Sequence, residues 1–309
     1  MADIKISVVI PAYNEEGNIR VIYNHLVPVL EHYPDYEIIF INDGSRDNTL
    51  NDLKELHRTN KKVQYLSFSR NFGHQLALKA GLDHATGDCV ISMDADLQHP
   101  VELIPAMIDK WREGFDIVYT IRADDPSLSL FKRVTATVFY KLINMISEIR
   151  IDPGSADFRL LDKRVIEVLR EIHEPHLFLR GIIPWVGFSQ FGLKYTPNAR
   201  HSGESKYSLI KMVFLAFNGL TSFSTKPLHA STLLGFFISL LSFLYGLYAI
   251  SVSVFTDKAV SGWASLIASV LFIGGIQLLM LGIIGEYLGK LFIESKRRPT
   301  YIIREKSHD

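Results

Sequence analysis

Two aspartates separated by a single residue, Asp94 and Asp96, follow an apolar segment, and Gln98 comes two residues later. Carboxylate and amide oxygens presented from one turn are the hard ligands that Mg²⁺ and Mn²⁺ prefer. A D-x-D tripeptide alone is a weak signal, but its position at the end of a strand-like segment strengthens it. The sequence therefore predicts that Asp94, Asp96 and Gln98 bind a divalent cation together with phosphate oxygens.

The D-x-D tripeptide follows one of five apolar segments of strand length, which lie at residues 4–10, 37–41, 63–67, 89–93 and 116–120. Nearly continuous apolar character is typical of strands covered on both faces. Helical patterns lie between them, at residues 16–31, 47–58, 74–85 and 100–111. Strands that alternate with helices predict an α/β fold with a mostly parallel sheet, which binds ligands at the carboxyl ends of its strands.

The segments directly after these five strands are residues 11–15, 42–45, 69–73 and 94–98, and Arg122. Most of them carry carboxylate, amide or guanidinium groups. Strand ends are often polar because they reach solvent, which explains one or two of these segments but not the set. The chain lacks both common Gly-rich phosphate motifs, G-x-G-x-x-G after the first strand and G-x-x-x-x-G-K-[ST] anywhere. The diphosphate of a bound nucleotide therefore needs another counter-charge, and a cation at the D-x-D tripeptide supplies one.

Composition excludes several classes of protein. Lys and Arg total 33 and Asp and Glu total 33, so the net charge is zero, which argues against a nucleic-acid partner held by a positive field. The single cysteine, Cys89, excludes an internal disulfide framework and a zinc site built on several thiolates. The mean hydropathy of +0.14 is high for a soluble enzyme.

The apolar excess is concentrated in residues 230–256 and 259–285, neither of which contains Lys, Arg, Asp or Glu. A helix of this length extends about 40 Å at about 1.5 Å per residue, whereas a bilayer core of about 30 Å needs only about 20 residues. We therefore expect a globular domain over residues 1–226, with juxtamembrane amphipathic helices, two transmembrane helices within 227–289, and a basic tail over 290–309. Two long core helices of a soluble protein are the alternative.

The distribution of positive charge predicts the orientation of this hairpin. The connection between the helices holds Lys258 beside Asp257, whereas both flanks are richer in cations: Lys206, Lys211 and Lys226 before, and Lys290, Lys296, Arg297, Arg298, Arg304 and Lys306 after. Positive flanks stay in the cytoplasm, so we expect a multi-pass protein of the cytoplasmic membrane with the globular domain and both termini inside.

Two further segments leave alternatives open. An apolar stripe over residues 131–149, bordered by Arg133 and other cations, fits a core-packing helix or a helix lying on the membrane surface. The basic loop from Arg200 to Lys206 fits attraction to lipid headgroups or phosphate binding.

Seven segments together resemble the polyprenyl-phosphate glycosyltransferases: residues 7–16, 41–45, 69–73, 94–100, 157–160, 203–206 and 285–289. This family includes the dolichyl-phosphate mannose synthases and the bacterial bactoprenol glucosyltransferases, and the resemblance to the latter is closer. It covers essentially the whole chain. The resemblance implies a Rossmann-like domain of the GT-A type, with helices on both faces of its sheet. It also implies transfer of one sugar, with inversion, from a nucleotide diphosphate to a lipid phosphate.

The resemblance also implies roles for individual residues. Those matched to nucleotide binding are Pro11, Tyr13, Glu15, Asp43 and Asp94, and those matched to the metal site are Asp94, Asp96 and Gln98. Arg122 and Arg133 are matched to the lipid phosphate, and Arg200 and Lys206 to the diphosphate or the lipid phosphate. Asp157 matches the acidic residue proposed as base in the bacterial branch. It is expected to accept a proton or orient a cation, and the alternative is a structural ion pair with Arg159 or Arg164.

The expected reaction is transfer of glucose from UDP-glucose to undecaprenyl phosphate at the cytoplasmic membrane face, with Mg²⁺ or Mn²⁺ and in a homo-oligomer. Mannose or another sugar is the alternative within this reaction class, and His74-Gln75, at a position where the branch varies, is expected to tune the donor. A processive synthase is disfavoured because no Trp follows Gln-x-x-Arg. The alternative from another class is a non-catalytic membrane scaffold.

Overall fold

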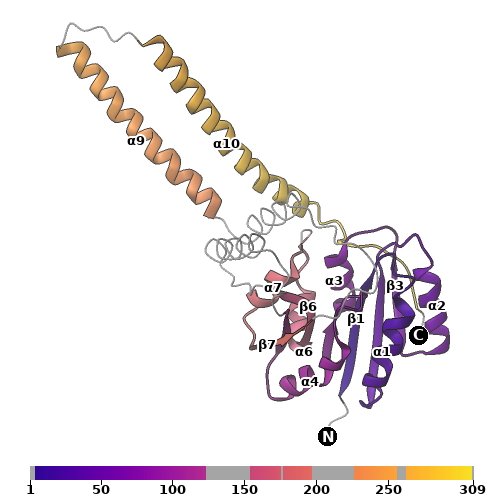
Figure 1. The fold of residues 1–309 in the computed structure, drawn as a ribbon. Helices are drawn as coiled ribbons and strands as arrows, with labels where there is room; N and C mark the ends of the chain where they lie inside the picture. Colours follow the sequence, from indigo (N-terminus) through magenta and orange to yellow (C-terminus); the bar gives the residue numbers. More distant parts are fainter. Residues whose placement is uncertain (1–3, 123–153, 175–176, 197–225, 256–261, 308–309) are drawn as a thin grey trace. The chain divides into compact units, whose positions relative to one another are not determined.

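The computed structural model describes residues 4–122, 154–174, 177–196, 226–255 and 262–307 (Figure 1). The chain divides into two compact units: residues 1–213 together with 298–309, and residues 214–297. Each unit is described by itself.

The first unit is built on one eight-stranded sheet in the order β7-β5-β6-β4-β1-β2-β3-β8. Its strands are β1 Lys5–Ala12, β2 Asp35–Asn42, β3 Val63–Phe68, β4 Cys89–Ser92, β5 Ile117–Arg122, β6 Ser155–Asp162, β7 Gln190–Tyr195 and β8 Ile303–Lys306. Strands β4, β1, β2 and β3 run parallel, as do β5 and β7, whereas β6 runs antiparallel to β4 and β5 and β8 antiparallel to β3. The predicted, mostly parallel α/β sheet is confirmed, and all five expected strands are present.

The helices of this unit are α1 Ile19–Leu30, α2 Thr49–Thr59, α3 His74–His84, the 3₁₀ turn Val101–Leu103, α4 Ile104–Arg112, α6 Lys163–Arg170 and α7 Leu179–Trp185. They cover both faces of the sheet, because alternate side chains of a strand point to opposite faces. Val8 of β1 packs in the core that contains the buried face of α1. Val9 points the other way, toward α3, where a Cβ on Gly81 would collide with the side chains of Val9 and Ile41. Glycine thus lets α3 lie close against the sheet.

The C-terminal segment belongs to the sheet. Strand β8 pairs with β3, and Tyr301, just before it, stacks on Phe68 with ring centroids 5.2 Å apart. The Tyr301 hydroxyl donates to Asp83 over 3.0 Å, and Ser69 N–H donates to Ile302 O over 3.0 Å. The sequence analysis treats residues 290–309 as a tail, whereas residues 303–306 form an edge strand of the first unit.

The second unit contains α9 Lys226–Phe255 and α10 Trp263–Ser295, which contact each other. Stretches Ser231–Tyr248 and Phe272–Ser295 are long and apolar enough to cross a membrane, judged by length and composition. Helix α10 continues ten residues beyond the charge-free run that ends at residue 285, and it includes Glu286 and Lys290.

Candidate active site

The register of the sheet brings the D-x-D turn beside Asp157. Ser92 of β4 pairs with Arg159 of the antiparallel β6, so Asp94, two residues past Ser92, lies next to Asp157. The Ser92 hydroxyl donates to the backbone oxygen of Asp157 over 2.6 Å and fixes this alignment. The two carboxylates come from segments 63 residues apart in the sequence.

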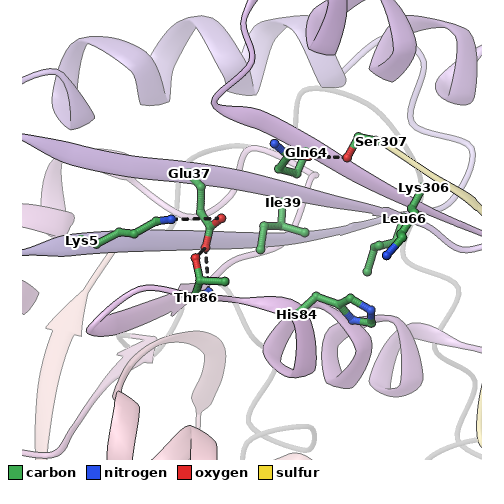
Figure 2. A pocket seen from close by; sticks show the side chains of 9 residues that line it. All are labelled: Lys5, Glu37, Ile39, Gln64, Leu66, His84, Thr86, Lys306 and Ser307. Atoms are coloured by element: carbon green, nitrogen blue, oxygen red, sulfur yellow. Dashed lines mark hydrogen bonds and ion pairs between the residues drawn. The ribbon is translucent and has the colours of Figure 1, made fainter. Parts of the chain in front are cut away.

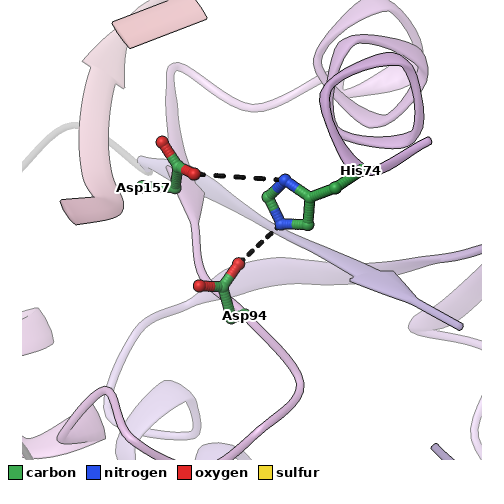
Figure 3. A group of neighbouring side chains, drawn as sticks. All are labelled: His74, Asp94 and Asp157. Atoms are coloured by element: carbon green, nitrogen blue, oxygen red, sulfur yellow. Dashed lines mark hydrogen bonds and ion pairs between the residues drawn. The ribbon is translucent and has the colours of Figure 1, made fainter. Parts of the chain in front are cut away.

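A histidine at the start of α3 lies between these carboxylates, as Figure 3 shows. His74 Nε2 is 2.7 Å from Asp94 Oδ1, and His74 Nδ1 is 4.0 Å from Asp157 Oδ2. His99 contacts Asp94 from the other side, with Nε2 3.7 Å from Oδ2, and its Nδ1 accepts the Asp94 backbone N–H over 3.1 Å. Asp94 is therefore held between two imidazole rings.

These neighbours control the ionisation of Asp94. Burial opposes the charged form, but the hydrogen bond from His74, the positive charge of His74 and that of Arg180 outweigh it and lower the pKa of Asp94 to about 2. Burial lowers the pKa of His74, yet the bond to Asp94 and the charge of Asp157 raise it overall. The pair thus favours an ionised carboxylate beside a protonated imidazole.

The D-x-D turn itself is a strained and internally bonded loop. Asp96 Oδ1 accepts the Gln98 backbone N–H over 3.2 Å, and Leu97 has a φ of 62°, which side-chain-bearing residues rarely adopt. Gln98 and His99 are buried, and the His99 ring stacks on Phe158 at 5.1 Å. Ionised Asp94 and the half-buried Asp96 are oxygen donors of the type that a hard divalent cation takes, so the residues fit such an ion.

A different trio has ligand atoms within 4.8 Å of one another, namely His74, Asp94 and Asp157. Within this trio Asp157 is paired with a guanidinium, and Asp94 is paired with the imidazole of His74. Arg180 Nε donates to Asp157 Oδ1 over 2.8 Å, and its Nη2 donates to Oδ2 over 2.9 Å. A cation placed at Asp157 would be repelled by this arginine.

The partner of Asp157 is therefore Arg180, not Arg159 or Arg164. Arg159 Nε donates to the backbone oxygen of Ala156 over 2.9 Å, and Arg164 pairs with Asp162 and Asp116. Burial raises the pKa of Asp157, but the charge of Arg180 and its hydrogen bonds outweigh burial and lower it. Asp157 is 5% exposed, so this ion pair is the principal environment of its carboxylate.

Helix α7 holds Arg180 in place. The backbone N–H of Leu179 donates to Gln75 Oε1 over 3.0 Å, and Leu179, Gly181, Ile182 and Ile183 are buried. The dipeptide His74-Gln75 therefore ties α3 to the D-x-D turn, to β6 and to α7. A role of this dipeptide in donor choice stays a prediction, and the structure shows its contacts with Asp94, Asp157 and Leu179.

Besides Asp94 in the D-x-D turn, the residues matched to nucleotide binding lie at the carboxyl ends of β1 and β2. Pro11 is buried in β1 opposite Ile41, whereas Tyr13 beyond the strand is 42% exposed. Glu15 accepts from Asn18 Nδ2 over 2.6 Å, and burial raises its pKa. Together they form the rim beside the D-x-D turn.

Asp43 supports a loop from inside. It is 2% exposed, and its two oxygens accept the backbone N–H groups of Phe72 and Gly73 over 2.7 and 2.9 Å. Burial raises its pKa more than these two bonds lower it. Asp43 thus fixes residues 69–73 at the rim.

The remaining predicted residues are only partly placed. Arg122 is the exposed last residue of β5, opposite Tyr195 of β7, and the Tyr195 ring lies 6.2 Å from that of His99. Arg133, Arg200 and Lys206 lie outside the described residues, as does the stripe over 131–149. Arg180 and His99 are site residues that the sequence analysis missed.

A separate hollow of about 510 Å³ lies away from the carboxyl ends of the strands, toward the amino ends of β1 to β3 (Figure 2). It is lined by Lys5, Glu37, Ile39, Gln64, Leu66, His84, Thr86, Lys306 and Ser307. The Glu37 carboxylate there accepts from Ser7 and Thr86. Because ligands of parallel sheets bind at the carboxyl edge, we do not assign the donor site to this hollow.

Comparisons with known proteins show which proteins this chain is similar to. The model of Glycosyl transferase family 2 matches residues 7–170, and that of the GtrB C-terminal hairpin matches residues 226–291. The bactoprenol glucosyl transferase of Shigella phage SfV is 45% identical over 303 residues, covering 98% of this chain and 99% of that protein. The uncharacterized glycosyltransferase YkcC of Bacillus subtilis (strain 168) is 42% identical over 303 residues, covering 98% and 94%. Mannosyl-3-phosphoglycerate synthase from Rubrobacter xylanophilus shares the fold, with a TM-score of 0.50 and 16% identity over 70% of this chain and 71% of that one.

Proposed function

The chain belongs to glycosyl transferase family 2, and we propose that it transfers one glucose unit from UDP-glucose to the phosphate of undecaprenyl phosphate, with inversion at the anomeric carbon. The observation that carries this proposal is the 45% identity to a bactoprenol glucosyl transferase over 98% of the chain, which spans both the sheet and the hairpin. A degenerate scaffold is disfavoured because the carboxylates of the site are all retained in one network.

We propose that Asp94 and Asp96, with Gln98, hold Mg²⁺ or Mn²⁺. A cation held by these residues would supply positive charge to offset that of the departing nucleoside diphosphate. Asp94 suits this role because its pKa is lowered to about 2, so it is ionised at neutral pH. The rim residues Tyr13 and Glu15 would contact the base and ribose of the donor, with Asp43 acting through the loop over 69–73.

The acceptor and the donor are both anions, so cationic side chains must lie between them before they can react. Arg122 is placed at the end of β5, and Arg133, Arg200 and Lys206 complete the proposed set. An arginine can bind a phosphate through two parallel hydrogen bonds, which fixes the direction of attack. The acceptor phosphate has a second pKa of about 6 and is largely ionised at neutral pH, so it can attack without a strong base.

The hairpin associates the protein with a membrane, and we propose that α9 and α10 both cross it. Strands on either side of the hairpin, β1 to β7 before it and β8 after it, belong to one sheet. Two flanks that share one sheet would lie on the same side of the bilayer, and their positive charge supports our proposal that this side is the cytoplasm. Assembly into a homo-oligomer remains a prediction.

Labelling of single cysteines tests this orientation. The native Cys89 is buried, so it gives a low background for a membrane-impermeant maleimide applied to intact cells. We expect label at Asp257→Cys, in the connection, and none at Lys296→Cys, after α10, until the cells are opened. Label at both positions in intact cells would refute the proposed orientation.

A donor screen tests the reaction. Detergent-purified protein, undecaprenyl phosphate and Mg²⁺ or Mn²⁺ are incubated with radiolabelled UDP-glucose, UDP-GlcNAc, UDP-galactose or GDP-mannose, and label in the lipid extract is counted. We expect label from UDP-glucose that requires both the lipid and the cation. Label from another donor alone would change the assigned sugar, and none from any donor with folded protein would favour the scaffold.

A further inference from the structure

We propose that Arg180 is a phosphate-binding residue of this active site and that Asp157 orients its guanidinium and does not accept a proton. The proposal rests on the proposed function, since it concerns the phosphate groups of the donor and the acceptor. It assigns a role to a residue outside the sequence motifs of the site. It also resolves the choice between base and orienting group for Asp157.

The position of Arg180 is fixed on two sides. Its Nε and Nη2 form a two-point contact with Asp157, and the neighbouring Leu179 is bonded to Gln75 and buried. A guanidinium with an ordered fork and an ordered backbone loses little further entropy when it binds an anion. Arg180 is thus pre-organised beside the D-x-D turn.

Arg180 also remains accessible. Its side chain is 40% exposed, whereas that of Asp157 is only 6% exposed, so the arginine forms the outer layer of the pair and the carboxylate the inner one. The exposed member of the pair is the one that a ligand meets. Its charge acts on Asp94, whose pKa it helps to lower.

The surroundings explain why a phosphate is the ligand. The rim and the turn concentrate the carboxylates of Glu15, Asp94, Asp96 and Asp157, which repel an approaching anion. A cation among them offsets that repulsion, and a guanidinium matches the geometry of phosphate oxygens. Asp157 engages the guanidinium through Nε and Nη2, and the side chain of Arg180 is still 40% exposed toward a ligand.

The same contacts make Asp157 a poor base. Both carboxylate oxygens accept hydrogen bonds from Arg180, and a proton arriving at either oxygen would break the two-point contact. The acceptor phosphate does not require proton removal, since it is mostly ionised at neutral pH. Orientation of Arg180 is the function left to Asp157 by this geometry.

The test uses the full-length protein in detergent with Arg180→Gln, Arg180→Lys and the matched control Arg164→Gln, which removes a 68% exposed arginine paired with Asp162 and Asp116. Binding of UDP and of undecaprenyl phosphate is measured separately from transfer. We expect Arg180→Gln to weaken binding of one ligand about 10- to 100-fold, as for loss of a hydrogen bond to a charged group. The affected ligand identifies the donor diphosphate or the lipid phosphate as the group bound.

A structural role is separated from phosphate binding by chemical rescue. Added methylguanidinium is expected to restore part of the transfer activity of Arg180→Ala. It should not change the transfer activity of Arg164→Gln. Arg180→Lys should bind its ligand better than Arg180→Gln but turn over more slowly than the native protein, because it keeps the charge without the fork. Native affinity for both ligands in folded Arg180→Gln would overturn the proposal.

Asp157→Asn tests the second half of the proposal. We expect slower transfer with the acidic limb of the pH–rate profile unchanged, because that limb follows the acceptor phosphate. Loss of the limb would show that Asp157 accepts the proton. If the native protein binds both ligands but transfers no sugar, the proposed function fails, while the binding ratios of the variants still decide the role of Arg180.

Discussion

Replacing Gly44 by alanine should disturb the active site through one added methyl group. Gly44 follows Asp43 and has a φ of +67°, in the left-handed region. A Cβ there would lie 2.6 Å from the backbone N of Asn71 and would also collide with the carbonyl carbon of Arg70. Both atoms belong to the loop over residues 69–73, and backbone cannot rotate away as a side chain can.

The size of the effect follows from these distances. An ordinary contact begins at 3.4 Å, so the loop must retreat by at least about 0.8 Å at Asn71 N, and by more at the carbonyl carbon of Arg70, which lies nearer. The bonds from Phe72 and Gly73 to Asp43, now 2.7 and 2.9 Å, would then reach or pass the limit for hydrogen bonding. Loss of one bond to a buried carboxylate costs about 1.5–3 kcal/mol, in addition to about 1–2 kcal/mol for alanine in the left-handed region.

The assay compares Gly44→Ala with Gly114→Ala. Gly114 lies between α4 and β5 with a φ of +105°, and nothing lies within 4 Å of its added Cβ. The Gly114→Ala variant therefore introduces backbone strain without a steric collision. We expect Gly114→Ala to lower only the melting temperature, and Gly44→Ala to lower it further and to raise the KM for UDP-glucose about tenfold or more.

The comparison has a clear refuting result. Equal melting temperatures and equal donor KM values for the two variants would show that the loop over 69–73 does not bear on donor binding. A lower melting temperature for Gly44→Ala with native KM would confirm the collision but refute the link from Asp43 through the loop to the donor.

Three further predictions concern the carboxylates and the C-terminal segment. Asp96→Ala should abolish cation-dependent transfer, and unchanged activity of the native protein in chelator would contradict the cation site. The pKa of Asp94 is lowered to about 2 and that of His74 is raised. We therefore expect their ion pair to stabilise the fold between about pH 4 and about pH 6.5. The stabilisation should weaken as the pH falls toward 2, where Asp94 is protonated, and as it rises through the pKa of His74, where the imidazole loses its charge. His74→Ala should lower the melting temperature most within that window, and an equal loss at about pH 3, 5 and 8 would argue against the pair. Tyr301→Phe keeps the ring but loses the hydrogen bond to Asp83, so it should cost about 0.5–1.5 kcal/mol, and Tyr301→Ala should cost more; equal melting temperatures of the two variants would mean that the stacked ring contributes nothing.

Much of the sheet and its binding edge was predictable because burial leaves a mark in the sequence. Runs such as Ile6 to Ile10 are apolar because both faces of β1 are covered, and the turn after β4 is polar because it ends at the ligand edge. The positions of Asp94 and Asp96 follow directly from those two facts. The charge-free runs likewise predict α9 and α10.

The network around Asp157 was not predictable in the same way. Arg180 lies 23 residues after Asp157, in a short helix with no motif around it, and pairing across elements leaves no periodic pattern. The alternatives Arg159 and Arg164 were nearer in sequence but point elsewhere. The histidines had a weaker signal, because His74 opens a helix just after the loop over 69–73 and His99 closes the D-x-D turn.

Strand β8 was missed because it carries the features of an edge strand. In this strand the cations Arg304 and Lys306 alternate with Ile303 and Glu305. Charged side chains on an exposed edge strand prevent unwanted pairing with another chain. Such a short charged segment after a long helix has the composition of a solvated tail. Only the partner strand β3, more than 230 residues earlier, identifies it.

The place of β8 in the sheet sets an order for biosynthesis. A ribosome makes the strands β1 to β7 first, then both apolar helices, and only afterwards the residues that cover the edge of β3. Until then β3 carries unpaired N–H and C=O groups that can recruit another chain. If α9 and α10 both cross the membrane, as we propose, a nascent protein whose hairpin fails to insert and return keeps that edge exposed. On that proposal, the last strand makes completion of the sheet depend on membrane insertion of the hairpin.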